Sequence, residues 1–279
     1  MSESPDAPYL DATDIGHVRL LTISHGKRNA LTGPVSRSLI AALDDVEADW
    51  SIRSVVITGS GAVFSAGADF GSGVESLHHE LVADGSEYAE WLEPIGAITQ
   101  RLLAMSAVSV VAINGDAIGG GATMTLGADL RVMSDEARIG FPFVNLGITP
   151  EGISSDLLER LTGRTSAVEL LLTGRLLSAE EAYKRRIVTQ TSPRDSVLET
   201  AMKVAEQISH RASPTSVALT KRLLNRPALA SAAQTRRAES DTLRLMDDHP
   251  DSREGISAFL ERRVPEFESR NVSKKGLKK

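Results

Sequence analysis

Short runs of β-branched and aliphatic residues alternate with helix-like patterns through the first half of the chain. These runs predict strands at residues 17–24, 53–59, 106–115 and 128–134. Between the first two runs, residues 35–50 repeat apolar side chains every three or four positions, which predicts one face of a helix. Strands separated by helices pair in parallel through crossover helices, so the pattern predicts an α/β fold.

Helix signals dominate after residue 155. Ser178 and Glu181 form a predicted capping box at the start of one helix. Further helices are expected at residues 195–209, 214–224, 230–247 and 251–262, with boundaries at Pro193, Pro214 and Pro227. A chain of 279 residues suits one main domain with an appended part, so we expect a core at 1–200 and a C-terminal helical region at 201–279.

The composition excludes several classes of function. A net charge of −6 without a basic stripe argues against nucleic-acid binding. The absence of cysteine excludes disulfides and thiolate chemistry, and the six histidines lack metal-ligand spacing, so no metal site is expected. No signal peptide and no run of about 18–20 apolar residues is present, which predicts a cytoplasmic protein without a membrane partner.

Two glycine-rich turns follow predicted strands: "FSAGAD" at 64–69 and "NGDAIGGGATM" at 114–124. Neither matches a phosphate loop, a dinucleotide fingerprint or a nucleophile elbow. Either turn alone is explained as a tight strand-to-helix connection. Together, at the ends of neighbouring parallel strands, they can aim two backbone N–H groups at one oxygen. Each donor of such an oxyanion hole is worth about 10² to 10³ in rate.

Residues 13–268 carry six co-linear motifs: HGKRNALT, FSAGAD, VAINGDAIGGGATMTLGADLRVMS, FPFVNLGITPEG, LTGRLLSAEEA and DSREGISAFLERR. Their order and spacing resemble the crotonase superfamily, the enoyl-CoA hydratase/isomerase family. The resemblance implies a repeated ββα spiral core with a C-terminal helical oligomerisation region, assembled as a homotrimer or a dimer of trimers. It implies an acyl-CoA thioester as ligand, with coenzyme A as part of the substrate and no separate cofactor.

The resemblance also assigns site residues. It places the oxyanion-hole amides at Ala68 and Gly120. It places the coenzyme A contacts at Lys27, Arg28, Ala30, Ala66, Gly67, Asp69 and Phe70. The two cations suit phosphates, and Ala30 leaves room for adenine. An ordinary solvated turn remains the alternative for Lys27 and Arg28, and a turn cap remains the alternative for Asp69.

The chain departs from the hydratases of this family, which use two glutamates to activate a water. Thr123 and Phe143 stand at those two positions, so efficient hydration is not expected. Glu151 instead resembles the base of the peroxisomal-type Δ3,Δ2-enoyl-CoA isomerases. Taken alone, a glutamate between Pro150 and Gly152 is a solvated turn carboxylate. The bulk of Ile153, where the family often has glycine, is expected to narrow the acyl pocket.

The surroundings of Glu151 are apolar in sequence, which would raise its pKa: Phe141, Phe143, Val144, Leu146 and Ile148. The segment 77–103 is predicted to be a helical insertion between two strands. In this family the insertion at 71–95 borders the acyl chain, and here it carries further acids, which are expected to face solvent: Glu75, Glu80, Glu87, Glu90 and Glu93. Its apolar residues either line the pocket or pack in the core: Tyr88, Trp91, Leu92 and Ile95.

The sequence therefore predicts a Δ3,Δ2-enoyl-CoA isomerase that shifts the double bond of a 3-enoyl-CoA through a dienolate, in fatty-acid β-oxidation or a related route. Three alternatives remain open at this point. They are another crotonase-type isomerisation, weak enoyl-CoA hydration, and non-catalytic binding of acyl-CoA.

Overall fold

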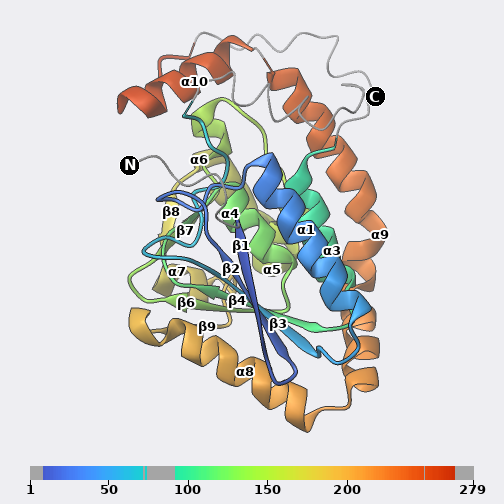
Figure 1. Cartoon of the computed structure of the whole chain (residues 1–279). Helices are drawn as coiled ribbons and strands as arrows, with labels where there is room; N and C mark the ends of the chain where they lie inside the picture. Colours follow the sequence, from blue (N-terminus) through green and yellow to red (C-terminus); the bar gives the residue numbers. More distant parts are fainter. Residues whose placement is uncertain (1–8, 72, 74–91, 248, 268–279) are drawn as a thin grey trace.

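A six-stranded sheet organises the fold (Figure 1). The computed structural model describes residues 9–71, 73, 92–247 and 249–267. The strand order is β1-β2-β3-β4-β6-β9, and every pair except β1–β2 is parallel, which confirms the α/β prediction. The strands of this sheet are β1 (Leu10–Ile15), β2 (Val18–Ile23), β3 (Ser54–Gly59), β4 (Val108–Ile113), β6 (Leu130–Ser134) and β9 (Gln190–Ser192). A smaller sheet, not predicted, contains β5 (Ala117–Ile118), β7 (Arg138–Gly140) and β8 (Leu176–Ser178).

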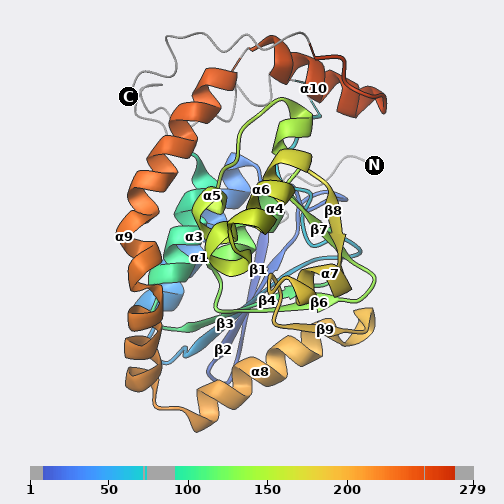
Figure 2. The same ribbon diagram turned by 180° about the vertical axis from the view of Figure 1, so that it is seen from behind.

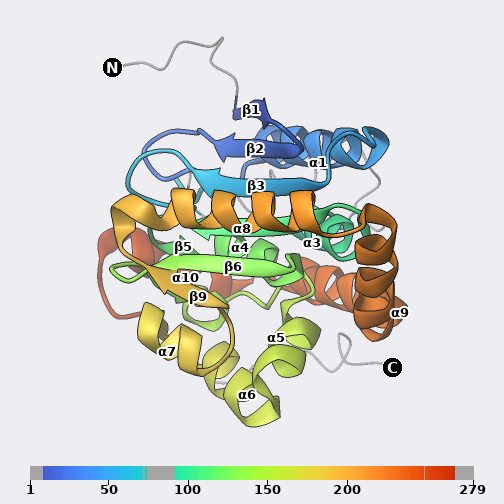
Figure 3. The same cartoon turned by 90° about the horizontal axis from the view of Figure 1, so that it is seen from below.

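Strands β3 and β4 are buried along their whole length because helices cover both faces of the sheet. Val55 and Ile57 belong to the core shared with α1 (Gly33–Ala48) and α3 (Pro94–Ala104). Val56 points to the opposite face and packs in a second cluster with α8 (Val197–Arg211). Figure 3 shows α8 crossing under the sheet. The predicted boundary at residue 200 falls within α8.

The remaining helices pack around the two sheets, and the longest of them runs along one side of the molecule (Figure 2). They are α4 (Gly120–Thr123), η1 (Met124–Gly127), η2 (Phe143–Leu146), α5 (Ser154–Thr162), α6 (Arg164–Thr173), α7 (Ala179–Lys184), η3 (Arg194–Ser196), α9 (Pro214–Met246) and α10 (Pro250–Glu261). The predicted capping box of Ser178 and Glu181 is confirmed at α7. Among the described residues, no helix is both long and apolar enough to cross a membrane.

The boundary predicted at Pro227 is wrong, because α9 is one helix that continues through this proline. Pro227 lies on the exposed face, where water can satisfy the carbonyl that loses its N–H partner. On the other face, Ala228 and Ala232 are buried, and this packing holds the helix together across the proline.

Candidate active site

The two glycine-rich turns lie side by side beyond the carboxyl ends of β3 and β4. The amide of Ile118 donates to the carbonyl of Ser65 over 2.9 Å. Gly67 has a φ of +77°, and a Cβ at this position would lie 2.7 Å from the Ile118 carbonyl oxygen and 2.9 Å from the Gly120 nitrogen. Only glycine fits this approach. We call these two segments the donor turns, residues 64–69 and 114–121.

The loop of the HGKRNALT motif is joined to the first donor turn by main-chain hydrogen bonds. Ala66 N donates to Arg28 O, and Leu31 N donates to Gly67 O, each over 2.9 Å. Asn29 is buried with a φ of +49°, and its side-chain amide donates to two carbonyls of the loop after β3, those of Ser60 and Val63. No sequence signal pointed to this anchoring role of Asn29.

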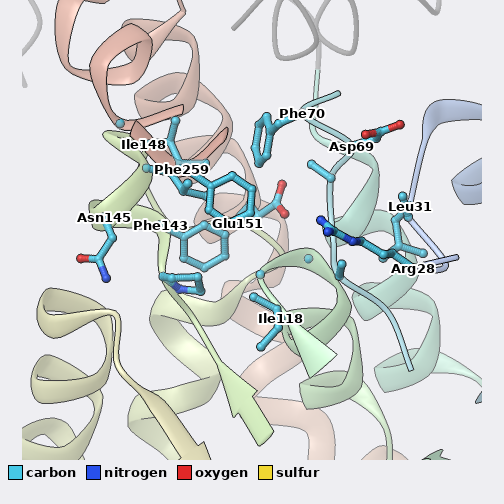
Figure 4. Close-up of a pocket in the computed structure, with 18 of the residues that line it drawn as sticks. Arg28, Leu31, Asp69, Phe70, Ile118, Phe143, Asn145, Ile148, Glu151 and Phe259 are labelled. Carbon is cyan, nitrogen blue, oxygen red and sulfur yellow. The ribbon is translucent and has the colours of Figure 1, made fainter. Parts of the chain in front are cut away.

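The predicted site residues line one cavity of about 860 Å³ (Figure 4). Its lining includes every predicted site residue except Gly67: Lys27, Arg28, Ala30, Ala66, Ala68, Asp69, Phe70, Gly120 and Glu151. Gly67 lies behind the lining, where it lets the donor turns meet. The end of α10 and the residues that follow it also line the cavity, through Phe259, Leu260 and Arg263. The DSREGISAFLERR motif marked this segment, but nothing in it predicted a role in the site.

Glu151 lies in a tight turn that leads into α5. Gly152 and Ile153 follow it with φ values of +72° and +63°, and Ser154 N donates to the Glu151 carbonyl over 3.2 Å. We call residues 149–153 the acid turn. A positive φ is strained for a β-branched residue, and the fully buried side chain of Ile153 packs in the core, which compensates for the strain. It does not line the cavity, so the prediction that it narrows the acyl pocket is wrong.

The acid turn is held by Glu239 of α9. One carboxylate oxygen of Glu239 accepts the Ile153 amide over 2.6 Å, and the other accepts the amide and the hydroxyl of Ser155 over 2.9 and 2.6 Å. Burial raises the pKa of Glu239, and the hydrogen bonds from Ser155 and Ile153 oppose that rise. A carboxyl group 84 to 86 positions away therefore caps α5 and fixes the direction of the acid turn.

The Glu151 carboxylate lies against the second donor turn. Its Oε1 is 2.8 Å from the point that a Cβ on Gly120 would occupy. Gly120 is the first residue of α4, so its amide has no partner within that helix. Figure 4 shows Glu151 between Phe143, Ile148 and Phe259 on one side and Arg28 on the other. Of the predicted apolar neighbours, Phe143, Leu146 and Ile148 line the cavity, whereas Phe141 and Val144 do not.

Neither position at which the resemblance expects a hydratase glutamate offers a carboxylate. Thr123 is buried, and its hydroxyl donates to the carbonyl of Gly120 over 3.2 Å. A Cβ on Gly152 would lie 2.6 Å from that hydroxyl, so the acid turn fills the space in front of Thr123. Phe143 lines the cavity with an aromatic ring.

Within the described residues, the other carboxylates that line the cavity have structural partners. Asp69 accepts the amide of Gly71 over 2.9 Å, as the turn-cap alternative predicted. Asp116 pairs with Arg138 over 2.6 Å. The described part of the chain contains no cluster of His, Asp or Glu that could hold a metal ion.

The prediction that Glu93 faces solvent is wrong, because its side chain is fully buried. It caps α3, where the following proline can take the first helical position. Ile95 lines the cavity and is also packed in the core, whereas Leu92 is half-buried and does not line the cavity. The remaining predicted residues of this segment lie outside the described residues: Glu75, Glu80, Glu87, Glu90, Tyr88 and Trp91.

The structure is that of an α/β protein with a cavity beyond the carboxyl ends of parallel strands. The family model for enoyl-CoA hydratase/isomerase matches residues 16–270. The chain therefore belongs to the enoyl-CoA hydratase/isomerase family, the crotonase superfamily, and its fold is the α/β fold of that family.

Relatives and solved structures agree with this assignment. A protein of Thermus thermophilus is 37% identical over 253 residues, which is 90% of this chain and 98% of the relative. The 2,3-dehydroadipyl-CoA hydratase of Escherichia coli is 32% identical over 254 residues, 91% of this chain and 96% of the relative. The crystal structure of an enoyl-CoA hydratase/isomerase from Pseudoalteromonas atlantica has a TM-score of 0.81 at 30% identity and covers 93% of this chain and 100% of that one.

Proposed function

We propose that this chain is a Δ3,Δ2-enoyl-CoA isomerase, which moves the double bond of a 3-enoyl-CoA to the trans-2 position. The observation that carries this proposal is the approach of Glu151 Oε1 to Gly120, 2.8 Å from the point that a Cβ would occupy there. A base so close to a donor amide can reach the C2 proton of a thioester while the amide faces the carbonyl oxygen.

A double-bond shift needs only one base. The Glu151 carboxylate takes a proton from C2, and the electron pair of the broken C–H bond delocalises over the carbonyl and the C3–C4 double bond. The amides of Ala68 and Gly120 stabilise the negative oxygen of this dienolate. The protonated Glu151 then returns the proton to C4, so the C3–C4 double bond is replaced by one between C2 and C3. No water is consumed.

Hydration of a 2-enoyl-CoA is the second candidate, because the Escherichia coli relative is named a hydratase. That reaction requires a water held between two carboxylates. The resemblance expects these two carboxylates at positions 123 and 143, where this chain has Thr123 and Phe143. Of the other carboxylates at the cavity, Asp69 accepts the Gly71 amide and Asp116 pairs with Arg138. Glu151 is left as a single base, which favours isomerisation.

The substrate and the assembly also belong to this proposal. Lys27 and Arg28 are exposed at the cavity, where they suit the phosphates of coenzyme A. Along α9, large apolar side chains are exposed at Leu219, Leu223 and Leu224. Burying them between copies would suit the proposed homotrimer or dimer of trimers, which sedimentation of the purified protein tests directly.

The proposed function is tested with a trans-3-enoyl-CoA and a trans-2-enoyl-CoA. We expect the first to be converted to the conjugated thioester and the second to remain unhydrated. In Glu151→Gln, kcat should fall by about 10² to 10⁴ while coenzyme A binding persists, because the amide keeps the size of the side chain but cannot take a proton. Glu199→Gln, at an exposed surface pair on α8, is the matched control.

Different results would point to the alternatives. Hydration of the 2-enoyl substrate would support the hydratase. Tight binding without turnover of either substrate would support a binding protein. Isomerase activity that survives in Glu151→Gln would remove Glu151 from the mechanism.

A further inference from the structure

Glu93 is a buried acid that the isomerase mechanism does not use. It precedes α3, and its carboxylate Oε2 accepts the Gly96 amide over 2.6 Å. Its own amide donates to the hydroxyl of Ser240 on α9 over 3.1 Å. Its exposed fraction is 0%, and it does not line the cavity.

The second oxygen of this carboxyl, Oε1, has no hydrogen-bond partner in the part of the chain that the structure describes. Arg236 is the nearby cation, with its Nε 3.8 Å from Oε1. However, Arg236 donates from Nε and Nη2 to the main-chain carbonyl of Glu93, over 3.1 and 2.8 Å. An ionised carboxyl with one oxygen lacking a donor is costly to bury, so this arrangement favours the neutral acid.

The first turn of α3 and the Glu151 carboxyl meet at Gly120. A Cβ on Gly120 would lie 3.3 Å from Ile95 Cγ1 and 2.8 Å from Glu151 Oε1. Burial raises the pKa of Glu93 well above its usual range, and the charge of Glu151 raises it further. Two groups of α9 also act on it: Arg236 lowers this pKa, and Glu239 raises it.

We propose that Glu93 and Glu151 act as one carboxyl pair that holds a single proton in the resting enzyme, with the proton on Glu93 and the negative charge on Glu151. The pair deepens the isomerase function proposed above and rests on it, because it requires Glu151 to be the base. Glu93 is a positioning residue that does not touch the substrate. Its neutral form keeps Glu151 ionised, whereas a second charge beside Glu151 would make Glu151 bind a proton and stop acting as a base.

Infrared spectroscopy without substrate tests the pair. A protonated carboxylic acid has a carbonyl band separate from the carboxylate bands. We expect such a band at neutral pH in the wild-type protein and in the surface control Glu199→Gln, and its loss in Glu93→Gln. Glu239→Gln separates this band from any contribution of Glu239, the other buried acid with a raised pKa.

Coupling is measured in Glu151→Gln, which leaves Glu93 in place. The band should disappear at a lower pH than in wild type, because the charge that opposes ionisation of Glu93 is gone. A residue with a purely structural role would show no such shift. The proposed pair is overturned if the band is absent at neutral pH, or if the pH at which the band is half lost is the same in Glu151→Gln and wild type. This holds even if the enzyme proves to be an isomerase. These spectra need no turnover, so failure of the isomerase function would be recognised separately, by the absence of product.

The pH dependence of kcat/KM on a 3-enoyl-CoA gives a second readout. If Glu93 is neutral, the acidic limb that reports Glu151 should stay at the same pH in Glu93→Gln, because one neutral group replaces another. A limb that moves to lower pH would show that Glu93 carried a charge, and would overturn the pair.

Discussion

The donor turns and the acid turn meet in one cavity, but different parts of the chain hold them in place. Main-chain hydrogen bonds and a close approach at Gly67 join the donor turns, which lie beyond the carboxyl ends of β3 and β4. The acid turn has two consecutive residues with positive φ and is held by Glu239, a side chain from a distant helix. The amides are therefore positioned by main-chain contacts between the turns, whereas the direction of the proposed base depends on a side chain from another helix.

The largest effect is expected where the donor turns touch. Gly67→Ala introduces a Cβ 2.7 Å from the Ile118 carbonyl oxygen at a φ of +77°. Backbone strain and overpacking should together lower the free energy of unfolding by about 2–6 kcal/mol. Chemical denaturation measures this loss, and kcat should fall in parallel because the Ala68 and Gly120 amides separate.

Gly61→Ala is the matched control for this change. Gly61 has a φ of +67°, and no atom lies within 4 Å of the point that a Cβ would occupy there, so only the backbone cost of about 1–2 kcal/mol applies. An equal loss in the two variants would show that the close approach of the donor turns adds nothing to stability.

A smaller effect is expected at the support of the acid turn. Glu239→Ala leaves the amides of Ile153 and Ser155 and the Ser155 hydroxyl without their acceptor. We expect a loss of about 2–4 kcal/mol in the free energy of unfolding. We also expect a fall of about 10- to 100-fold in kcat, because the proposed base is no longer held in its orientation.

Ser155→Ala removes only one of these donors and should cost about 1 kcal/mol. Far-UV circular dichroism with denaturant gives both stabilities, and steady-state kinetics gives the fall in kcat. If Glu239→Ala keeps full turnover, the acid turn is held by its own backbone, and the contrast with the donor turns disappears.

This contrast explains which features could be predicted from the sequence. A buried strand followed by glycines is local information, and it was enough to place β3, β4 and both donor turns. The burial of Glu93 could not be predicted, since the charge pattern of residues 71–95 is that of a solvated helix. Its burial depends on Ser240 and Arg236, more than 140 positions away. The helix boundary predicted at Pro227 is wrong for the same reason, because the packing of α9 outweighs the local effect of a proline.

The last effect is a dependence of stability on pH at Glu93, and it is measured without substrate. The folded state raises the pKa of Glu93 above the ordinary value of 4.5, mainly through burial. A group shifted in this direction contributes stability that is complete below its unfolded pKa and is lost as pH rises through its folded pKa. The Glu93→Gln side chain has no proton to lose. Its free energy of unfolding should therefore increase relative to that of wild type as pH rises.

Between the two pKa values, this difference should grow by about 1.4 kcal/mol for each pH unit. Denaturant titrations of wild type and Glu93→Gln from mildly acidic to alkaline pH measure it, and Glu199→Gln corrects for removing a surface carboxylate. Gly67→Ala should follow the wild-type pH dependence, because the donor turns are joined by groups that do not titrate. A flat difference between wild type and Glu93→Gln would mean that Glu93 is ionised in the folded protein, and that the first turn of α3 is held by an ion pair with Arg236.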